Sequence, residues 1–175
     1  MKKTNLFIIA AVAAFFTGCA SYQASSLSAL DPDFVKSYSE AQDLEIGCKA
    51  YPVDDCFAFF DRNVIAKGYQ PVQLTFKNAS DKRYVFSTKY LTFPCASAEE
   101  VAHTVHTSTV GRVAGYGVGG LFVWPLFIPA VVDGIKSSNA NTALDKDFDQ
   151  KAKNDLLIAA HSYSKTVIFV PKSHF

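Results

Sequence analysis

Two closely spaced histidines are the side chains in this chain best placed to bind a metal ion. His103 and His106 are three residues apart, and residues with this spacing share one face of a helix. Zinc sites need further ligands, commonly close cysteine pairs such as C-x-x-C, and the sequence contains no such pair. No third ligand is evident near the two histidines, so we expect no metal site.

A run of alternating aspartates could instead suggest calcium. Asp145, Asp147 and Asp149 follow the first ligand positions of a calcium-binding loop. Such a loop needs Gly at its sixth position and Glu at its twelfth, where this chain has Gln150 and Leu156. We therefore interpret the three aspartates as one solvated face of a helix.

Residues 115–120 satisfy the pattern G-x-G-x-x-G, which binds dinucleotides when it joins a strand to the helix that follows. Here a helix is predicted before the pattern, and an apolar stretch broken by prolines follows it, so we expect no cofactor. The patterns G-x-S-x-G, H-E-x-x-H and the P-loop do not occur in the sequence. We find no catalytic constellation and expect that the chain is not an enzyme.

The N-terminus has the composition of a secretory signal peptide. Two lysines precede the apolar run 6–16, which is too short to cross a bilayer, since spanning takes about 20 residues. The run ends in F-T-G-C at 16–19, which resembles the lipobox of bacterial lipoproteins, with Phe16 where Leu is usual. This resemblance implies that residues 1–18 are removed and that Cys19 is acylated on its sulfur and its new amine. The alternative is an ordinary secretory signal whose cleavage site contains a cysteine.

Acylated Cys19 would bind membrane lipid almost permanently, because two or more acyl chains anchor a protein stably and one chain only marginally. In the lipoproteins that this segment resembles, an Asp directly after the cysteine retains the protein at the inner membrane. Ala20 and Ser21 follow here instead. The resemblance therefore implies a lipid-anchored protein of the bacterial outer membrane, at its periplasmic face.

The mature chain would be short and nearly neutral. Removal of residues 1–18 would leave 157 of the 175 residues and change the formal net charge from +1 to −1. A near-neutral chain without a basic run lacks the electrostatic surface by which proteins bind nucleic acid. The remaining length suits one domain with a modest core.

Lipidation of Cys19 would leave three cysteines in an oxidising compartment, where disulfides form and persist. Cys48 and Cys56 flank the turn-like segment 51–55, and we favour a disulfide between them. Cys56–Cys95 is the competing pair. An odd number of cysteines also means that one thiol stays free or pairs with another chain.

The segment after the signal is rich in Ser, Ala and Gln, and we interpret residues 19–43 as a flexible lipidated tether with a short helix after Pro32. Strand signals begin at residue 44, so we assign residues 44–175 to one β-sandwich domain. The first candidate strands are residues 44–51 and the aromatic-rich residues 56–65.

The clearest strand pattern is residues 72–77, which alternate apolar and polar side chains and so predict one face on a core and the other in water. The polar loop 78–82 and the aromatic segment 83–93 complete a predicted antiparallel hairpin. Residues 156–160 and 166–170 predict a second hairpin. Several short strands separated by turns predict an immunoglobulin-like β-sandwich, which together with a helical insertion makes an α+β fold.

The helical insertion covers about residues 97–153. Ser97 and Glu100 have the spacing of a capping box, which predicts a helix that continues past both histidines. The uncharged stretch 113–132 contains four glycines and two interior prolines, which disfavour one straight membrane-spanning helix. We predict instead a helical hairpin with an apolar tip, whose second helix runs over about residues 129–153.

Three glycines of this hairpin are spaced four residues apart and form one flat stripe if the segment is helical: Gly111, Gly115 and Gly119. Such stripes let helices approach closely, so this one packs against a second subunit, a membrane neighbour or the hairpin's own second arm. The apolar tip is too large to leave exposed, and we favour its burial against a partner or the bilayer. Its aromatic side chains are Phe122, Trp124 and Phe127.

The whole layout resembles a loose set of uncharacterised bacterial lipoproteins. These combine a lipobox, a strand pair, a Gly-rich apolar helical hairpin and a final strand that ends near F-V-P. The matching segments here are residues 18–19, 72–93, 111–132 and 167–171. The resemblance implies an envelope location and a non-enzymatic role, and it names no partner.

Two hypotheses of function follow from these predictions. In the first, the chain is a structural or assembly component of an outer-membrane or secretion-type complex, bound to another envelope protein or to further copies of itself. In the second, it is a periplasmic binding module for a small ligand or a protein, with the helical hairpin as its lid.

The lipobox leads to the first testable prediction. Replacement Cys19→Ala should abolish acylation and release the protein from the outer-membrane fraction, because the sulfur that carries the diacylglycerol is gone. Palmitate labelling and membrane fractionation measure both effects. Palmitate label that persists on the Cys19→Ala protein would contradict the lipoprotein assignment.

Overall fold

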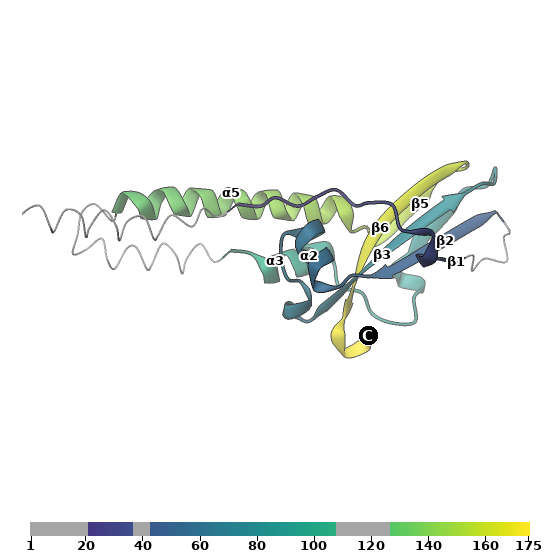
Figure 1. The fold of residues 1–175 in the computed structure, drawn as a ribbon, viewed down its shortest axis with the longest axis horizontal. Helices are drawn as coiled ribbons and strands as arrows, with labels where there is room; N and C mark the ends of the chain where they lie inside the picture. Colours follow the sequence, from purple (N-terminus) through teal and green to yellow (C-terminus); the bar gives the residue numbers. More distant parts are fainter. Residues whose placement is uncertain (1–20, 37–42, 108–126) are drawn as a thin grey trace, which may run out of the picture. The chain divides into compact units, whose positions relative to one another are not determined.

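The computed structural model describes residues 21–36, 43–107 and 127–175 of the chain (Figure 1). The chain divides into two compact units. One consists of residues 1–21 and 107–140, and the other of residues 22–106 and 141–175. The second unit contains the strands of the described residues, and we call it the domain. Among the described residues, no helix combines the length and apolarity that a membrane span requires.

Helices and antiparallel strands are mixed along the chain, which confirms the α+β class. In chain order the described strands and α-helices are β1 (Val35–Lys36), β2 (Leu44–Ala50), α2 (Val53–Phe60), β3 (Tyr69–Asn78), β4 (Tyr84–Ser87), α3 (Ala98–Val105), α5 (Phe127–Lys151), β5 (Asp155–Ile158) and β6 (Ser162–Pro171).

The strands form two antiparallel sheets. Four strands lie in the order β1-β2-β3-β6, and β3 and β6 pair along their whole length, from Tyr69 opposite Pro171 to Asn78 opposite Ser162. Figure 1 shows β2, β3 and β6 running side by side. Strands β4 and β5 form a separate two-stranded sheet, which we call the outer sheet.

Both predicted hairpins are wrong, although their strands exist. Strand β3 pairs with β2 and β6 and not with β4, while β5 pairs with β4 and not with β6. The turns after β3 and β5 are held together by Asn78, whose Nδ2 donates to the carbonyl oxygens of Lys82 at 2.7 Å and Ala159 at 2.8 Å. The chain reverses direction at both turns. The outer sheet therefore folds back over the paired strands β3 and β6. Stacking buries the apolar faces of both sheets. If β4 and β5 were instead added to the edge of the four-stranded sheet, those faces would stay exposed.

This stacking places Phe86 of the outer sheet against Phe76 of β3, with ring centroids 5.3 Å apart. The apolar side chains of the alternating segment therefore lie between the two sheets, as the pattern predicted. The prediction that its polar side chains face water is wrong, because Gln73 and Thr75 are both buried. The helices cover that face of the four-stranded sheet, so both faces of β3 are inside the protein.

The predicted strand 56–65 is also wrong, since residues 53–60 form the helix α2. Cys56 and Phe60 are four residues apart, and both are fully buried on one face of this helix. Asp54 and Asp55 lie in its first turn, where the helix dipole favours acidic side chains. The helix ends at Asp61, which adopts the left-handed conformation with φ of 50°.

The Ser97 half of the predicted capping box is confirmed, since the Ser97 hydroxyl accepts a hydrogen bond from the Glu100 backbone N–H at 3.0 Å. The Glu100 carboxylate instead accepts a hydrogen bond from the Tyr69 hydroxyl at 2.7 Å. The prediction that this helix continues past both histidines is wrong, because the helix ends at Val105 and His106, its C-cap, has a non-helical ψ of 142°. The predicted second helix is present as α5.

The rest of the predicted hairpin lies outside the described residues and stays a prediction. This applies to the glycine stripe and to the aromatic residues of the tip: Gly111, Gly115, Gly119, Phe122 and Trp124. Phe127 is the first residue of α5.

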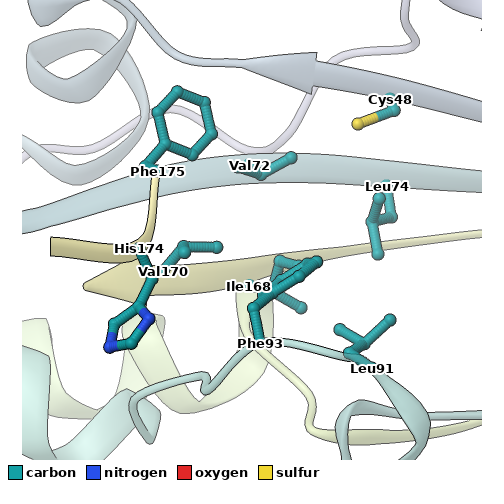
Figure 2. A pocket seen from close by; sticks show the side chains of 9 residues that line it. All are labelled: Cys48, Val72, Leu74, Leu91, Phe93, Ile168, Val170, His174 and Phe175. Carbon is teal, nitrogen blue, oxygen red and sulfur yellow. The ribbon is translucent and has the colours of Figure 1, made fainter. Parts of the chain in front are cut away.

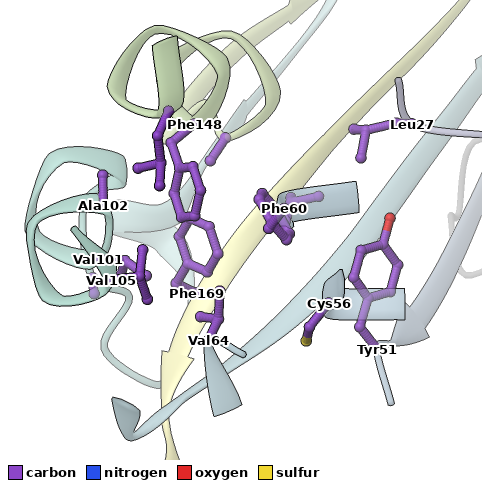
Figure 3. Packing of buried hydrophobic residues seen from close by; sticks show 14 residues of the cluster. Leu27, Tyr51, Cys56, Phe60, Val64, Val101, Ala102, Val105, Phe148 and Phe169 are labelled. Carbon is purple, nitrogen blue, oxygen red and sulfur yellow. The ribbon is translucent and has the colours of Figure 1, made fainter. Parts of the chain in front are cut away.

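The buried apolar residues between the helices and the four-stranded sheet form a cluster that we call the helix-side core. Three phenylalanines from different elements lie at its centre (Figure 3). Phe60 of α2 lies 4.7 Å from Phe148 of α5 and 5.4 Å from Phe169 of β6, measured between ring centroids. Phe148 and Phe169 are stacked at 5.7 Å. Helix α3 adds buried Val101, so this aromatic cluster joins three helices to the sheet.

The aromatic cluster predicts a large loss of stability for Phe60→Ala. Truncation of a fully buried Phe costs about 3–5 kcal/mol, because it removes apolar burial and leaves a cavity. Phe57→Ala on the same helix is the matched control, since Phe57 is 51% exposed and surface changes alter stability by about 0.5 kcal/mol. Urea unfolding measures both free energies. Equal losses in the two variants would contradict this packing.

Candidate functional site

The N-terminal part of the described chain is bound to the domain, so the prediction of a flexible tether is wrong for residues 22–28, which we call the strap. The Tyr22 hydroxyl donates to the Asp147 carboxylate on α5. The Tyr22 ring also lies 5.5 Å from the Arg62 guanidinium, a cation–π distance. The next residue, Gln23, donates its backbone N–H to Asp61 Oδ2 at 3.2 Å. The first two residues of the strap therefore bind both α5 and the C-terminal end of α2.

The rest of the strap is held by backbone hydrogen bonds and by one apolar anchor. Ser25 N–H donates to the Ala58 carbonyl at 2.9 Å. Leu27 is only 8% exposed and belongs to the helix-side core. Lys165 Nζ donates to the Leu27 carbonyl at 2.5 Å. The strap is thus attached to α2, to the core and to β6.

Gln73 joins the strap to the centre of the sheet. Its Nε2 donates to the Ser28 carbonyl at 2.9 Å, and its Oε1 accepts a hydrogen bond from the Tyr51 hydroxyl. The side chain is fully buried, and a buried amide is costly unless its donors and acceptors have partners. The strap therefore satisfies a polar group that β3 places inside the protein.

The carboxylate that binds Tyr22 is partly buried and also forms an ion pair with a buried lysine. Lys151, one helical turn along α5, is buried and donates to Asp147 Oδ2 at 2.6 Å and to the Phe59 carbonyl at 2.6 Å. Burial, with the hydrogen bond and charge of Asp147, raises the pKa of Tyr22 well above its usual value. The phenol stays protonated at neutral pH and remains a donor to Asp147.

An apolar pocket of about 220 Å³ lies on the face of the four-stranded sheet that points away from the helices (Figure 2). Its lining comes from β2, β3, β6, the segment after β4 and the C-terminal residues. The residues are Cys48, Val72, Leu74, Leu91, Phe93, Ile168, Val170, His174 and Phe175. Such a lining can take an apolar group but offers few polar atoms to orient a reacting molecule.

The histidines considered for a metal site do not form one. His106 Nε2 lies 2.5 Å from Asp145 Oδ1, which links α3 to α5, and His103 Nε2 lies 3.9 Å from Glu99 Oε1. In the part of the chain that the structure describes, no group of three His, Cys, Asp or Glu side chains could hold a metal ion. The aspartates are not one solvated face either, because Asp145 and Asp147 are partly buried and bonded, and only Asp149 is exposed.

Cys48, Cys56 and Cys95 are free thiols, so the predicted Cys48–Cys56 disulfide is not formed. Cys56 lies in the helix-side core, whereas Cys48 lines the pocket on the other face of the sheet. Cys95 packs against the core between the sheets, so the alternative Cys56–Cys95 pair is separated in the same way.

The remaining pair, Cys48 and Cys95, shares one face but lies too far apart. Cys48 is on β2, and Ala96, the neighbour of Cys95, bridges to Phe169 on the far edge of β6. Three strand spacings of about 4.8 Å therefore separate the two thiols, roughly 14 Å in all. A disulfide needs Cα atoms within about 7 Å.

The sequence did not indicate the strap, because its residues show neither strand alternation nor helical periodicity. One signal was present: Asp147 and Lys151 have the i, i+4 spacing of a helical ion pair. That spacing predicts the pair and says nothing of its burial or of Tyr22. Comparison of the chain with family models, curated proteins and solved structures finds no match.

The separation of the cysteines predicts three unpaired thiols in protein purified without reductant. Maleimide should label exposed Cys48 faster than Cys56, which should react only after unfolding. Desolvation raises the pKa of both thiols, to about 11 for Cys56, and Cys56 is also hidden in the core. Mass spectrometry of labelled peptides measures both rates, and Cys48→Ser should remove the fast reaction. A disulfide-linked peptide within one chain would contradict this arrangement.

Proposed function

We propose that the chain is a lipid-anchored lipoprotein at the periplasmic face of the bacterial outer membrane. In this proposal it acts without catalysis, as a structural or assembly component of an envelope complex or homo-oligomer. The observation that carries the proposal is the lipobox-like F-T-G-C at 16–19, directly after eleven apolar residues.

A patch of exposed apolar side chains on the outer sheet supports a protein partner. Val85 and Leu157 lie opposite each other on β4 and β5, and they are 68% and 60% exposed. Tyr90, which follows β4, is more exposed still. Contiguous exposed apolar side chains mark interaction sites on protein surfaces, so this group supports a protein partner.

The finer description of the fold is part of the same proposal. Face-to-face packing of two antiparallel sheets supports an immunoglobulin-like sandwich. The constant-type immunoglobulin fold has seven strands, and the described residues supply six, so this description stays a prediction. The Gly-rich hairpin, which would contact a subunit or the membrane, lies mostly outside the described residues.

The proposed assembly role predicts that Val85→Lys and Leu157→Lys together abolish cross-linking of the protein into a membrane complex. The two lysines would place charge in an interface that is apolar in the wild type. Stability should change little, because both positions are exposed. Tyr163→Lys on β6, at another exposed apolar side chain, is the control and should cross-link normally. Unchanged cross-linking of the double variant would exclude the outer sheet as the interface.

A binding module remains the second candidate, and the apolar pocket is the observation that favours it. A pocket of about 220 Å³ would take a small apolar ligand or part of a longer one. Native mass spectrometry of protein purified from cells distinguishes the two candidates. A stoichiometric small molecule that protects Cys48 from maleimide supports the binding module, whereas a stoichiometric protein complex supports the assembly role.

A further inference from the structure

We infer that the strap clamps the helix layer of the domain against the membrane that carries Cys19, so that the outer sheet faces away from the bilayer. This inference rests on the proposed lipidation of Cys19. It concerns the reach and orientation of the domain, which the lipobox alone leaves open. Its basis is the short length of chain between the anchor and the first docked residue.

Covalent geometry limits the distance between anchor and domain. Cys19 and Tyr22 are three residues apart, so their Cα atoms are separated by at most about 11 Å. If residues 20–43 were instead a free tether, their average end-to-end distance would be about 27 Å and their full extension about 80 Å. The docked strap therefore removes most of the reach that the sequence length would allow.

The docking site of Tyr22 identifies the side of the domain that lies next to the membrane. Tyr22 contacts Asp147 on α5 and Arg62 just after α2, and Gln23 contacts Asp61 at the end of α2. These contacts belong to the helix layer. The outer sheet lies across the four-stranded sheet, about two layer spacings of roughly 10 Å farther away.

The charges around Tyr22 suit a position beside lipid headgroups. Arg62 Nη1 pairs with Asp61 Oδ2 at 2.8 Å, and Lys151 pairs with Asp147 at 2.6 Å. Each carboxylate that the strap contacts is therefore balanced by a cation, so approach to an anionic headgroup layer is not opposed by unpaired acidic groups. Tyr and Arg side chains are also favoured at the membrane interface.

This orientation has a consequence for the partner. The apolar residues Val85 and Leu157 lie on the outer sheet, on the far side of the domain from the anchor. A protein that covers them must approach from the periplasmic side and meet the domain close to the outer membrane.

The experiment compares two fluorophore positions on the lipidated full-length protein in vesicles that contain acceptor-labelled headgroups. The dye is attached to Phe57→Cys on the helix layer or to Leu157→Cys on the outer sheet, both exposed sites, in a Cys48→Ser, Cys95→Ser background. We expect energy transfer to the headgroups to be severalfold faster from position 57 than from position 157.

A strap-release variant tests the cause of this difference. Leu27→Asp should expel the strap from the core, because an unpaired carboxylate cannot remain buried. We expect the two dye positions to become equivalent and residues 22–28 to become sensitive to protease. Ser26→Asp adds the same charge at an exposed neighbouring position and should keep the wild-type difference.

A second variant avoids any change to the core. Insertion of a twelve-residue Gly-Ser segment between Ser21 and Tyr22 leaves the docked strap intact and adds about 19 Å of average reach. Energy transfer should fall at both positions while protease resistance of the strap persists. Equal transfer from positions 57 and 157 in the palmitate-labelled wild type overturns the inferred orientation alone. Absence of palmitate label overturns the inference together with the proposed function.

Discussion

The contact among Phe60, Phe148 and Phe169 holds together the elements on which the rest of the structure depends. One ring comes from a helix early in the chain, one from the long helix α5 and one from the last strand. Their burial fixes α2 and α5 on the same face of the sheet, and Leu27 of the strap packs into the same core. The groups that bind Tyr22, on α5 and at the end of α2, are therefore placed correctly only when this cluster is formed.

The second constraint is a buried polar one. Strand β3 carries Gln73 into the core, and its amide is satisfied by Tyr51 and by the strap. A free N-terminal segment would leave part of that amide without a partner, which costs about 1–3 kcal/mol for a buried group. This penalty favours the docked strap and links the position of the anchor to the interior of the sheet. The shared acceptor Asp147 adds to the same effect, since it serves both Tyr22 and buried Lys151.

The two faces of the four-stranded sheet therefore have different roles in the proposed function. The helix face binds the strap and determines how far the domain stands from its anchor. The other face carries the outer sheet, the apolar pocket and the exposed pair of Val85 and Leu157. An assembly component needs one side for attachment and another for its partner, and this division supplies both. The free thiols follow the same division, with Cys56 on the helix side and Cys48 on the pocket side.

Local patterns in the sequence determined those features that depend on neighbouring residues. The strand over 72–77 follows from alternation, the cap at Ser97 from side-chain capping, and the start of the second helix from the prolines that interrupt the apolar stretch. The structure contains all three. Tertiary structure decided the rest. Residues 53–60 are helical because Cys56 and Phe60 then share one buried face, and β4 leaves its sequence neighbour because stacking buries the apolar faces of both sheets. The sequence patterns predicted neither the docked strap nor the separation of Cys48 from Cys56, because both depend on which face of the sheet each residue packs against. Segments that are distant in the sequence compete for the same buried surface. The face on which each one packs therefore cannot be predicted from any short stretch of sequence.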